Sequence, residues 1–339
     1  MSFNIRYTRK SFSKTHAKQQ GIVLLAVLVL LLIISLVITG ANVLLESRLN
    51  LAVSAKENLR NKAAAISKAN QLTYLLATQR LTIAGISQGI NPEGFARNED
   101  DQFINLIVGD EIRVDGHVYE FEQKQFSYSI QSQRGLLSVN TSGQRWLKKW
   151  IQSQNQDALQ TNRMLDSLFD YADGDYTQKP AGKDGKNYQN IRNYLLQSCS
   201  ELFLVQHWQA FLTLHPDFLS HCSLQRSSVL NLNQVPISLW RIFWPTSIDR
   251  LIEMRDSGLW FSTLSDAYLV EPSIAGLSEQ HLSTLGGQQF SVMVSYPITN
   301  SKLQNEIDLG QAKESKLKNQ IVCLIHVGSG NNPPMVIKP

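Results

Sequence analysis

The chain has 339 residues, of which 43% are hydrophobic and 18% charged, and its formal net charge at pH 7 is +4. This length allows one large domain or two modest ones beside a leader and a membrane segment. The first 21 residues carry five basic residues and no acidic one, so the rest of the chain has a net charge near −1. The basic charge is therefore confined to the N-terminus, and the charge balance gives no support to a nucleic-acid-binding protein.

An apolar run from Gly21 to Gly40 follows these basic residues, and no charged residue occurs between Lys18 and Glu46. A helix needs about 20 mainly apolar residues to cross the core of a bilayer. The run also lacks the polar face that an amphipathic helix of a soluble protein shows. Because basic flanks stay in the cytoplasm, we expect a membrane-spanning helix over residues 22–41 and the rest of the chain on the opposite side.

A secretory signal has its small-residue cleavage site after the apolar region. In this chain the small residue stands before the apolar run instead. The chain reads Lys18-Gln-Gln-Gly21 and then Ile22-Val-Leu-Leu-Ala26. This order resembles the type IV prepilin signal, in which a membrane prepilin peptidase cuts after the glycine and the apolar run is kept. The resemblance implies a leader of residues 1–21, cleavage between Gly21 and Ile22, and methylation of the new N-terminus. The alternative is an uncleaved signal anchor with a chance glycine.

The helical pattern continues beyond the membrane run, with apolar residues spaced by three or four and charged residues on the other faces. No proline interrupts residues 42–80. We expect one helix from Ile22 to about Thr78, in lipid over its first half and amphipathic, on the far side of the membrane, over its second half. A helix of this two-part kind resembles the N-terminal helix of pilins. The pattern is then broken by Gly85, Gly89, Pro92 and Gly94.

From Phe103 onward the apolar period changes to two, which is typical of strands. The residues that would share one face on either side of Asp115-Gly116 are Ile112, Val114, Tyr119 and Phe121. An Asp-Gly dipeptide between two such runs predicts a β-hairpin with a two-residue turn.

Later runs keep the alternation: Phe126 to Ile130, Phe290 to Tyr296, and Ile321 to Val327. A polar segment from Thr299 to Asn319 separates the last two, and we expect a loop there. The predicted antiparallel sheet thus comes from residues 81–134 and 286–330, and helical sequence at 135–285 is inserted between its two parts.

The inserted segment carries the most distinctive residues. Two Leu-x-Val/Leu-Asn motifs, at 137–140 and 230–233, open its helical stretches. Between them an aspartate-rich stretch, from Leu165 to Asp175, leads into a loop with Pro180, Gly182 and Gly185. In this order, the leader, the long helix, the strands and the insertion resemble the minor pseudopilin K family of the type II secretion system (general secretion pathway protein K). The resemblance covers nearly the whole chain.

This resemblance implies an α+β, pilin-like fold, in which a long N-terminal helix packs on a small antiparallel sheet, with a large inserted all-α domain. It implies a subunit that caps the tip of the periplasmic pseudopilus and helps to start its assembly for protein secretion across the outer membrane. It also implies an inner-membrane location. The implied partners are the I- and J-type minor pseudopilins, the major pseudopilin, the inner-membrane assembly platform and the prepilin peptidase.

Ala26, the fifth residue of the expected mature chain, agrees with this resemblance. Most members of the pilin superfamily have Glu at that position, whereas the K subunit typically lacks it. A carboxylate inside the bilayer costs several kcal/mol unless it is paired, and in a fibre its partner would be the N-terminal amine of the subunit above. A subunit at the tip has no neighbour above it, so alanine removes that cost. An ordinary anchor that never assembles would tolerate alanine equally.

Asp170, Asp173 and Asp175 supply the oxygen ligands that hard cations prefer, and the resemblance implies structural calcium held by this segment. The spacing departs from that of an EF-hand loop. Asp184 is a further candidate ligand, although the family often has Gly-Ala-Glu where this chain has Gly182-Lys183-Asp184. The alternative is that these side chains are ordinary carboxylates at a helix end and a turn.

Three cysteines are present, and no Cys-x-x-Cys motif. An oxidising compartment permits a disulfide, for which Cys199 and Cys222 are the favoured pair. The alternative is three buried thiols that act as small apolar residues, with Cys323 as the third.

The sequence contains no motif that points to catalysis. The seven His residues include no HExxH motif and no ligand pair at zinc spacing, and Gly-x-Ser-x-Gly is absent. We expect His207, His215 and His221 at surface or loop positions and not in a zinc cluster. The six Trp all lie in the insertion, and we expect them mainly in its core. We therefore expect no enzymatic activity.

The segment from Leu230 to Trp260 resembles helix-hairpin-helix DNA-binding modules in outline. Those modules hold phosphate with the N–H groups of a Gly-rich hairpin, whereas the hairpin position here, Phe243 to Ser247, contains Pro245 and no glycine. We expect a structural relic that binds no nucleic acid. Two alternative functions stay open: a minor pilin of a type IV pilus, which predicts no helical insertion, and a membrane-anchored periplasmic DNA-binding module.

Overall fold

The computed structural model describes residues 20–121, 125–141, 144–174, 179–180, 194–277, 280–298, 318–327 and 335–337. The chain divides into two compact units, Met1–Arg60 with Thr299–Ser315, and Asn61–Ile298 with Lys316–Pro339. The described residues of the first unit form the beginning of helix α1 (Gln20–Thr78), which continues into the second unit. The strands and the other helices belong to the second unit.

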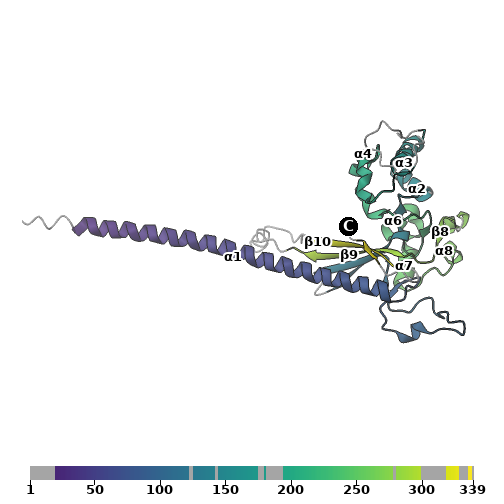
Figure 1. Ribbon diagram of the computed structural model, residues 1–339, viewed down its shortest axis with the longest axis horizontal. Coiled ribbons are helices and arrows are strands. Elements are labelled where there is room, and N and C mark those ends of the chain that lie inside the picture. Colours follow the sequence, from purple (N-terminus) through teal and green to yellow (C-terminus); the bar gives the residue numbers. More distant parts are fainter. Residues whose placement is uncertain are drawn as a thin grey trace, which may run out of the picture. The chain divides into compact units, whose positions relative to one another are not determined.

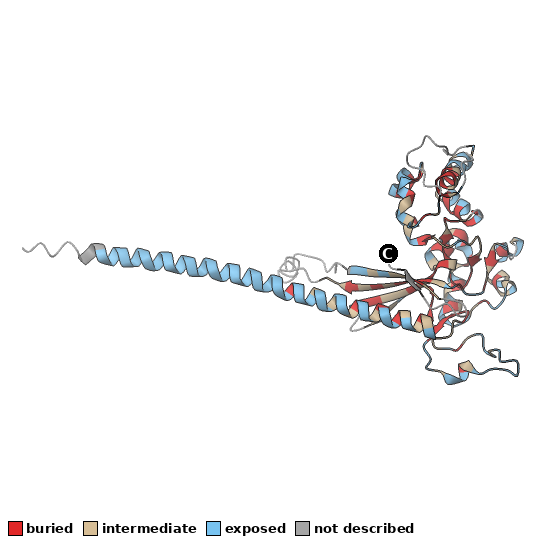
Figure 2. Ribbon diagram, in the orientation of Figure 1, coloured by how far each residue is buried: buried red, intermediate tan, exposed pale blue. Residues whose placement is uncertain are grey.

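The first part of α1 is apolar and exposed along its length (Figure 2). Its most apolar window has a mean hydropathy of 3.2, and none of that window is buried. Leu24 and Leu36, for example, are 70% and 69% exposed. The predicted single helix from Ile22 to Thr78 is confirmed, and by length and composition its apolar part is compatible with a single-pass membrane anchor.

The last part of α1 packs on a sheet. Ala65, Ala69, Leu72 and Leu76 recur at helical spacing on one face, and they are buried in one cluster with apolar residues of the strands. Figure 1 shows this part of α1 running beside β9 (Gln289–Pro297) and β10 (Lys318–His326). The helix therefore changes from an exposed apolar rod to one half of a protein core, as its sequence pattern predicts.

The sheet is antiparallel, with strand order β11-β10-β9-β4-β3. The bounds of the remaining strands are β3 (Asp115–Phe121), β4 (Phe126–Ser132) and β11 (Met335–Ile337). Alternation is clearest in β9, where Phe290, Val292, Val294 and Tyr296 are buried and the residues between them are not. Because β4 pairs with β9, the sheet joins its two parts across the inserted segment. The expected loop after Thr299 lies outside the described residues up to residue 317.

The hairpin predicted at Asp115-Gly116 is wrong. β2 (Glu111–Arg113) pairs with β1 (Gly85–Ser87) in a separate two-stranded sheet, and β3 pairs with β4. Gly116 does have a left-handed φ of +82°, which glycine adopts at little cost. It lies, however, at a shift of register between Asp115 and Val118. A β-bulge requires the same backbone freedom as a tight turn, so the dipeptide alone does not distinguish them.

Between β4 and β9 the described residues are mainly helical. The α-helices are α2 (Arg145–Ser153), α3 (Ala158–Ala172), α4 (Trp208–Leu214), α5 (Phe218–His221), α6 (Ile237–Phe243), α7 (Ile248–Asp256) and α8 (Leu264–Val270). Short 3-10 turns are η1 (Pro92–Phe95), η2 (Gln133–Gly135), η3 (Cys199–Leu204), η4 (Pro245–Ser247) and η5 (Pro272–Gly276). Figure 1 shows the helices of the segment gathered beyond one end of the long strands.

The expectation of an all-α insertion needs one correction. The segment also contains two short parallel strand pairs, β5 (Leu137–Ser138) with β6 (Cys222–Ser223) and β7 (Leu230–Asn231) with β8 (Leu282–Ser283). These pairs join residues that lie far apart in the sequence, so no local periodicity predicts them. The α+β class itself, a long helix on an antiparallel sheet with a large helical insertion, is confirmed.

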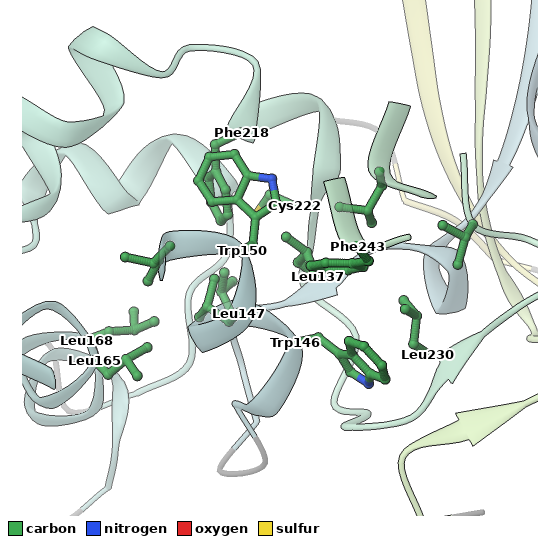
Figure 3. Packing of buried hydrophobic residues seen from close by; sticks show 14 of the residues in the cluster. Leu137, Trp146, Leu147, Trp150, Leu165, Leu168, Phe218, Cys222, Leu230 and Phe243 are labelled. Carbon is green, nitrogen blue, oxygen red and sulfur yellow. The ribbon is translucent and has the colours of Figure 1, made fainter. Parts of the chain in front are cut away.

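Tryptophan side chains fill the core of the helical segment, as predicted. Trp150, Trp208 and Trp240 are fully buried, and Trp146 and Trp244 are nearly so. Figure 3 shows Trp146 and Trp150 on α2 among leucines from several elements, with Phe218 beside Trp150. The indole of Trp208 also donates a hydrogen bond to the carbonyl of Met164 on α3 (2.9 Å). The sixth, Trp260, is half-buried.

Candidate functional site

The N-terminal helix is the first candidate site. Gly21 and Ile22 lie in its first turn, because α1 begins at Gln20, and the leader before it lies outside the described residues. Ala26 is exposed, and its neighbours along the helix are exposed apolar residues. The described segment from Val23 to Leu45 thus presents a continuous uncharged surface. Cleavage between Gly21 and Ile22 stays a prediction.

The aspartate-rich stretch lies at the end of α3. Asp170, in the last turn, is fully buried, and both of its carboxylate oxygens accept the backbone N–H of Lys179, at 3.0 and 3.2 Å. Asp173 is the C-terminal cap of the helix, and its N–H donates to the carbonyl of Phe169. Asp175 and Asp184 lie outside the described residues. The structure therefore brings Asp170 and Asp173 to one helix end without testing the whole ligand set.

A cavity of about 730 Å³ opens beside this helix end. Asp173 and Gly174 line it together with polar side chains from other segments, among them Asn140, Gln144 and Arg226. Within the described residues, no group of three or more His, Cys, Asp or Glu side chains is placed to hold a metal ion. His207, His215 and His221 belong to no such group, and the surface or loop position expected for His221 is wrong, because this residue lies in α5 and is buried.

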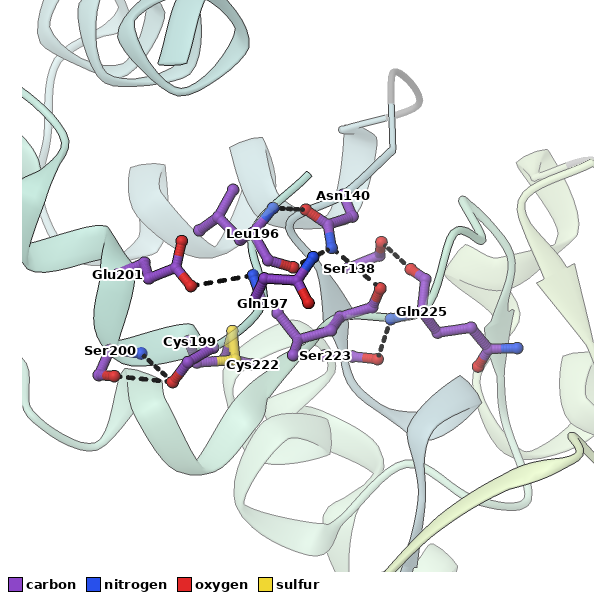
Figure 4. The surroundings of a disulfide bond; sticks show 12 residues. Ser138, Asn140, Leu196, Gln197, Cys199, Ser200, Glu201, Cys222, Ser223 and Gln225 are labelled. Atoms are coloured by element: carbon purple, nitrogen blue, oxygen red, sulfur yellow. Dashed lines mark hydrogen bonds between the residues drawn. A yellow bond between two sulfur atoms is a disulfide. The ribbon is translucent and has the colours of Figure 1, made fainter. Parts of the chain in front are cut away.

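The two Leu-x-Val/Leu-Asn motifs have equivalent roles. The side-chain amide of Asn140 accepts the N–H of Leu196 and donates to two carbonyls, those of Leu196 and Leu224 (Figure 4). Asn233 likewise accepts the N–H of Phe261 and donates to the carbonyls of Phe261 and Thr284. Each buried Asn, two residues after a short strand, therefore joins the chain there to two distant segments. Through these two side chains the motifs hold the helical segment together.

The disulfide between Cys199 and Cys222 is present, as predicted, and it spans 23 residues (Figure 4). It joins the start of η3 to β6, at the position where β6 pairs with β5. Cys323, on β10, is a free, half-buried thiol. Disulfides persist in oxidising compartments and are rare in the cytosol, so the bridge is consistent with an exported domain.

A buried charged cluster, which we call the junction cluster, consists of Arg113, Asp115 and Arg255. Asp115 Oδ2 lies 2.6 Å from Arg113 Nη2 and 2.8 Å from Arg255 Nη1. Burial by itself raises the pKa of Asp115, but the charges of Arg255 and Arg113 outweigh it and hold that pKa below its usual value. Burial lowers the pKa of Arg255 to about 10, so the guanidinium stays charged at neutral pH.

Sequence reasoning missed the junction cluster. The sequence pattern assigns Asp115 to a turn and gives no sign that Arg255 is buried. The available signal was that Arg113 and Asp115, two residues of opposite charge, alternate with the apolar residues Ile112 and Val114. Charged residues are almost never fully buried unless they are paired, but their partner from α7 cannot be identified before the fold is known.

The hairpin position of the segment that resembles DNA-binding modules is the turn η4, between α6 and α7. The Thr246 hydroxyl donates to a carboxylate oxygen of Glu271 at 3.4 Å. A carboxylate at this position repels phosphate, and Pro245 supplies no N–H. The geometry thus agrees with the expectation of a structural relic.

The chain was compared with known proteins. No family model matches it, and no curated protein matches its sequence. One similar solved structure is described as the crystal structure of the GspK-GspI-GspJ complex from the type 2 secretion system of enterotoxigenic Escherichia coli. The match has 13% sequence identity and a TM-score of 0.49, and it covers 83% of this chain and 97% of that chain. At these values the likeness establishes no family membership, and the proposals below depend on the residues of this chain.

Proposed function

We propose that the chain is a minor pseudopilin of a type II secretion system, anchored in the inner membrane with its sheet and helical segment in the periplasm. The observation that carries this proposal is the single helix α1, 59 residues long. Its first part is apolar and exposed, as a lipid-facing anchor requires, and its last part forms the core of a sheet through Leu72 and Leu76. The basic N-terminus, with Gly21 directly before the apolar run, adds the expected leader.

The position we propose is the tip of the pseudopilus, where the subunit would help assembly to begin. Ala26 supports this position because no carboxylate at the fifth mature residue needs an amine from a subunit above. The helical segment between β4 and β9 supports it as well, because so large an addition to one subunit suits a cap better than a closely packed shaft.

The helical segment also discriminates between the candidate functions. A minor pilin of a type IV pilus predicts a compact sheet domain without such a segment, and here helices α2 to α8 occupy it. A periplasmic DNA-binding module requires a phosphate-binding hairpin, and the turn η4 has Pro245 and the Glu271 carboxylate instead. We therefore favour the pseudopilin, with no nucleic-acid partner and a structural role without catalysis.

The partners that follow from this proposal are the I- and J-type minor pseudopilins, the major pseudopilin, the assembly platform and the prepilin peptidase. The exposed apolar surface of α1 is suited to packing against other membrane helices.

N-terminal sequencing of the purified chain tests the proposal. In cells with a prepilin peptidase the mature chain should begin at Ile22, and in cells without it the leader should remain. A bulky Gly21→Leu variant should stay unprocessed, because the peptidase requires a small residue there. Gly40→Leu is the matched control, since a Cβ at Gly40 meets no atom within 4 Å. A chain that begins at Met1 in both strains would reject the proposal.

We also propose structural calcium at the end of α3, held by Asp170, Asp173 and Asp175, with Asp184 as a further candidate. The described residues fit such an ion in part. Asp170 is a fully buried carboxylate at a helix end, and the N–H of Lys179 donates to both of its oxygens. Carboxylate oxygens are the ligands that calcium prefers, and a bound ion would tie the residues that follow to α3, with no part in any reaction.

Thermal unfolding with and without calcium tests this site. A ligand at a hundredfold excess over its Kd stabilises the folded state by about 2.7 kcal/mol, so calcium should raise the Tm of the wild-type chain. Asp173→Asn should abolish the rise, whereas Asp249→Asn, an exposed position on α7, should keep it. If Asp173→Asn lowers the Tm equally in calcium and in chelator, the carboxylate is an ordinary helix cap.

A further inference from the structure

Two separate apolar cores lie in the second unit. One contains the last part of α1 and the sheet, the other contains the helical segment, and the two clusters have no described residue in common. The chain crosses between them after β4 and again before β9. Because the clusters do not merge, apolar packing does not by itself fix the helical segment on the sheet. Polar contacts at the crossing must contribute.

Arg255 is the residue that bridges the two sides. It lies on α7 and is fully enclosed, with 0% of its side chain exposed. Its guanidinium donates to two carbonyls of the helical segment, Val235 and Leu232, both at 2.9 Å. Its Nη1 also donates to Asp115 of the sheet at 2.8 Å. One side chain thus ties a carboxylate of β3 to the backbone that precedes α6.

Among the described residues, Asp115 is the acceptor that Arg255 contacts on the sheet side. Its side chain is 1% exposed, and besides Arg255 it accepts from Arg113 on β2 and from the N–H of His117 at 3.1 Å. The bulge at Gly116 turns the start of β3 so that this N–H reaches the carboxylate. The junction cluster therefore connects α7 with both the main sheet and the small β1–β2 sheet.

The three side chains of the cluster carry two positive charges and one negative charge while Asp115 is ionised, and no negative charge when it is neutral. Two guanidinium groups share this one buried carboxylate, and Asp256, the other acid near Arg113, is 63% exposed and 3.3 Å away. Without the charge of Asp115, two cations would face each other, and Arg255 has no exposed surface through which water could screen it.

A second contact is the point about which the helical segment would rotate. Gln131 on β4 donates to the carbonyl of Gln234 at 2.9 Å. The backbone of Gly135 approaches the same carbonyl so closely that a Cβ would lie 1.9 Å from its oxygen. This contact lies at the crossing itself and involves no ionised group, so it does not depend on charge.

We propose that the junction cluster is a charge-dependent latch between the two cores. While Asp115 is ionised, Arg255 holds the helical segment in one orientation on the sheet. When Asp115 is neutral, the segment is released to move about the contact between Gly135 and Gln234, and both cores stay folded. While the latch is closed, the two cores present one rigid surface to a partner.

We expect the latch to open when the pH falls. The titratable and charged groups that face the cluster are Arg113 on β2, His117 and Tyr119 on β3, and Arg255 and Asp256 on α7. The pKa of Asp115 is lowered in the folded chain, so the closed latch is present above the ordinary carboxyl pKa and is lost as the pH falls through the folded value. The pKa of His117 is lowered by burial and then by Arg113, so its protonation adds a cation beside Arg113 and also favours opening on acidification.

Distance measurements between two spin labels test the latch in the full chain in detergent. The labels are placed at Val118 on β3 and Leu269 on α8, which are 60% and 81% exposed, in a Cys323→Ser background with the disulfide intact. We expect one narrow distance in the wild type. Asp115→Asn should broaden it by roughly twofold or more, as expected of released segments, with tryptophan emission and helix content unchanged. Asp256→Asn is the control and should leave it narrow, since an exposed charge contributes little.

Acidification supplies a readout that a purely structural role would not move. The wild-type distance should broaden as the pH falls, whereas Asp115→Asn should be broad at every pH. A narrow distance in folded Asp115→Asn overturns the proposal. If Asp115→Asn does not fold, Asp115→Asn with Arg255→Met removes both charges. A folded double variant with a broad distance supports the latch, and a narrow distance or failure of this variant to fold overturns it.

Discussion

Replacing Trp150 with alanine should lower the free energy of unfolding by about 3–5 kcal/mol, the range found for large aromatic truncations in cores. Trp150 is fully buried on α2 (Figure 3), and its ring centroid lies 4.8 Å from that of Phe218 and 5.7 Å from that of Phe211. Its indole nitrogen has no hydrogen-bond partner among the described residues. The variant therefore removes packing contacts and no hydrogen bond. The cavity that it leaves lies between α2, α4 and α5.

Chemical denaturation followed by far-UV circular dichroism measures this effect. Leu214→Ala is the matched control, because Leu214 ends the neighbouring helix α4 and is 74% exposed. Surface substitutions of this kind usually change stability by less than about 0.5 kcal/mol. Similar losses in the two variants would mean that the helical segment has no packed tryptophan core.

Breaking the disulfide should be the next largest loss. With a sequence separation of 23 between the two cysteines, the loop-closure relation gives about 3 kcal/mol of stabilisation. Cys199→Ser should therefore lower the midpoint of denaturation substantially, and a reducing agent should do the same to the wild type but not to the variant. The reason is that the bridge restricts the unfolded chain between η3 and β6.

The control for the disulfide is Cys323→Ser. Cys323 is a free, half-buried thiol on β10, so its replacement should change stability little, and a reductant should destabilise this variant as much as it destabilises the wild type, because the bridge is still present. Thiol labelling of the protein isolated from membranes without reductant gives a second measurement. Only Cys323 should react. Labelling at all three cysteines would contradict both the bridge and export of the helical segment to an oxidising compartment.

Local periodicity was sufficient for the elements whose burial follows from their own sequence. In α1, the spacing of Ala69, Leu72 and Leu76 already marks the face that meets the sheet. The alternation in β9 is just as direct, because successive side chains of a strand point to opposite faces. These elements could be placed before the fold was known, since each one shows which of its faces is buried.

The junction cluster and the Asp115-Gly116 bulge could not be predicted from local periodicity. An Asp-Gly dipeptide records that glycine is needed at a positive φ, but not whether the chain then turns or bulges. The burial of Asp115 depends on Arg255, which is 140 residues away in the sequence. The short pairs β5–β6 and β7–β8 are equally non-local, because each joins two-residue strands with no pattern of their own.

The sequence by itself determined the long helix, its apolar exposed part, the strand alternation, the tryptophan-rich core and the favoured cysteine pair. The helix and the strand alternation follow from residue types at short, regular spacing, where the physical preference of a segment does not depend on distant partners. The tryptophan core and the cysteine pair were expected from residue type alone. Only the tertiary structure decided that Asp115 is buried between two arginines and that Asn140 and Asn233 tie separate segments together. Burial of a polar group is stable only when its partners are in place, and the folded chain alone brings those partners together.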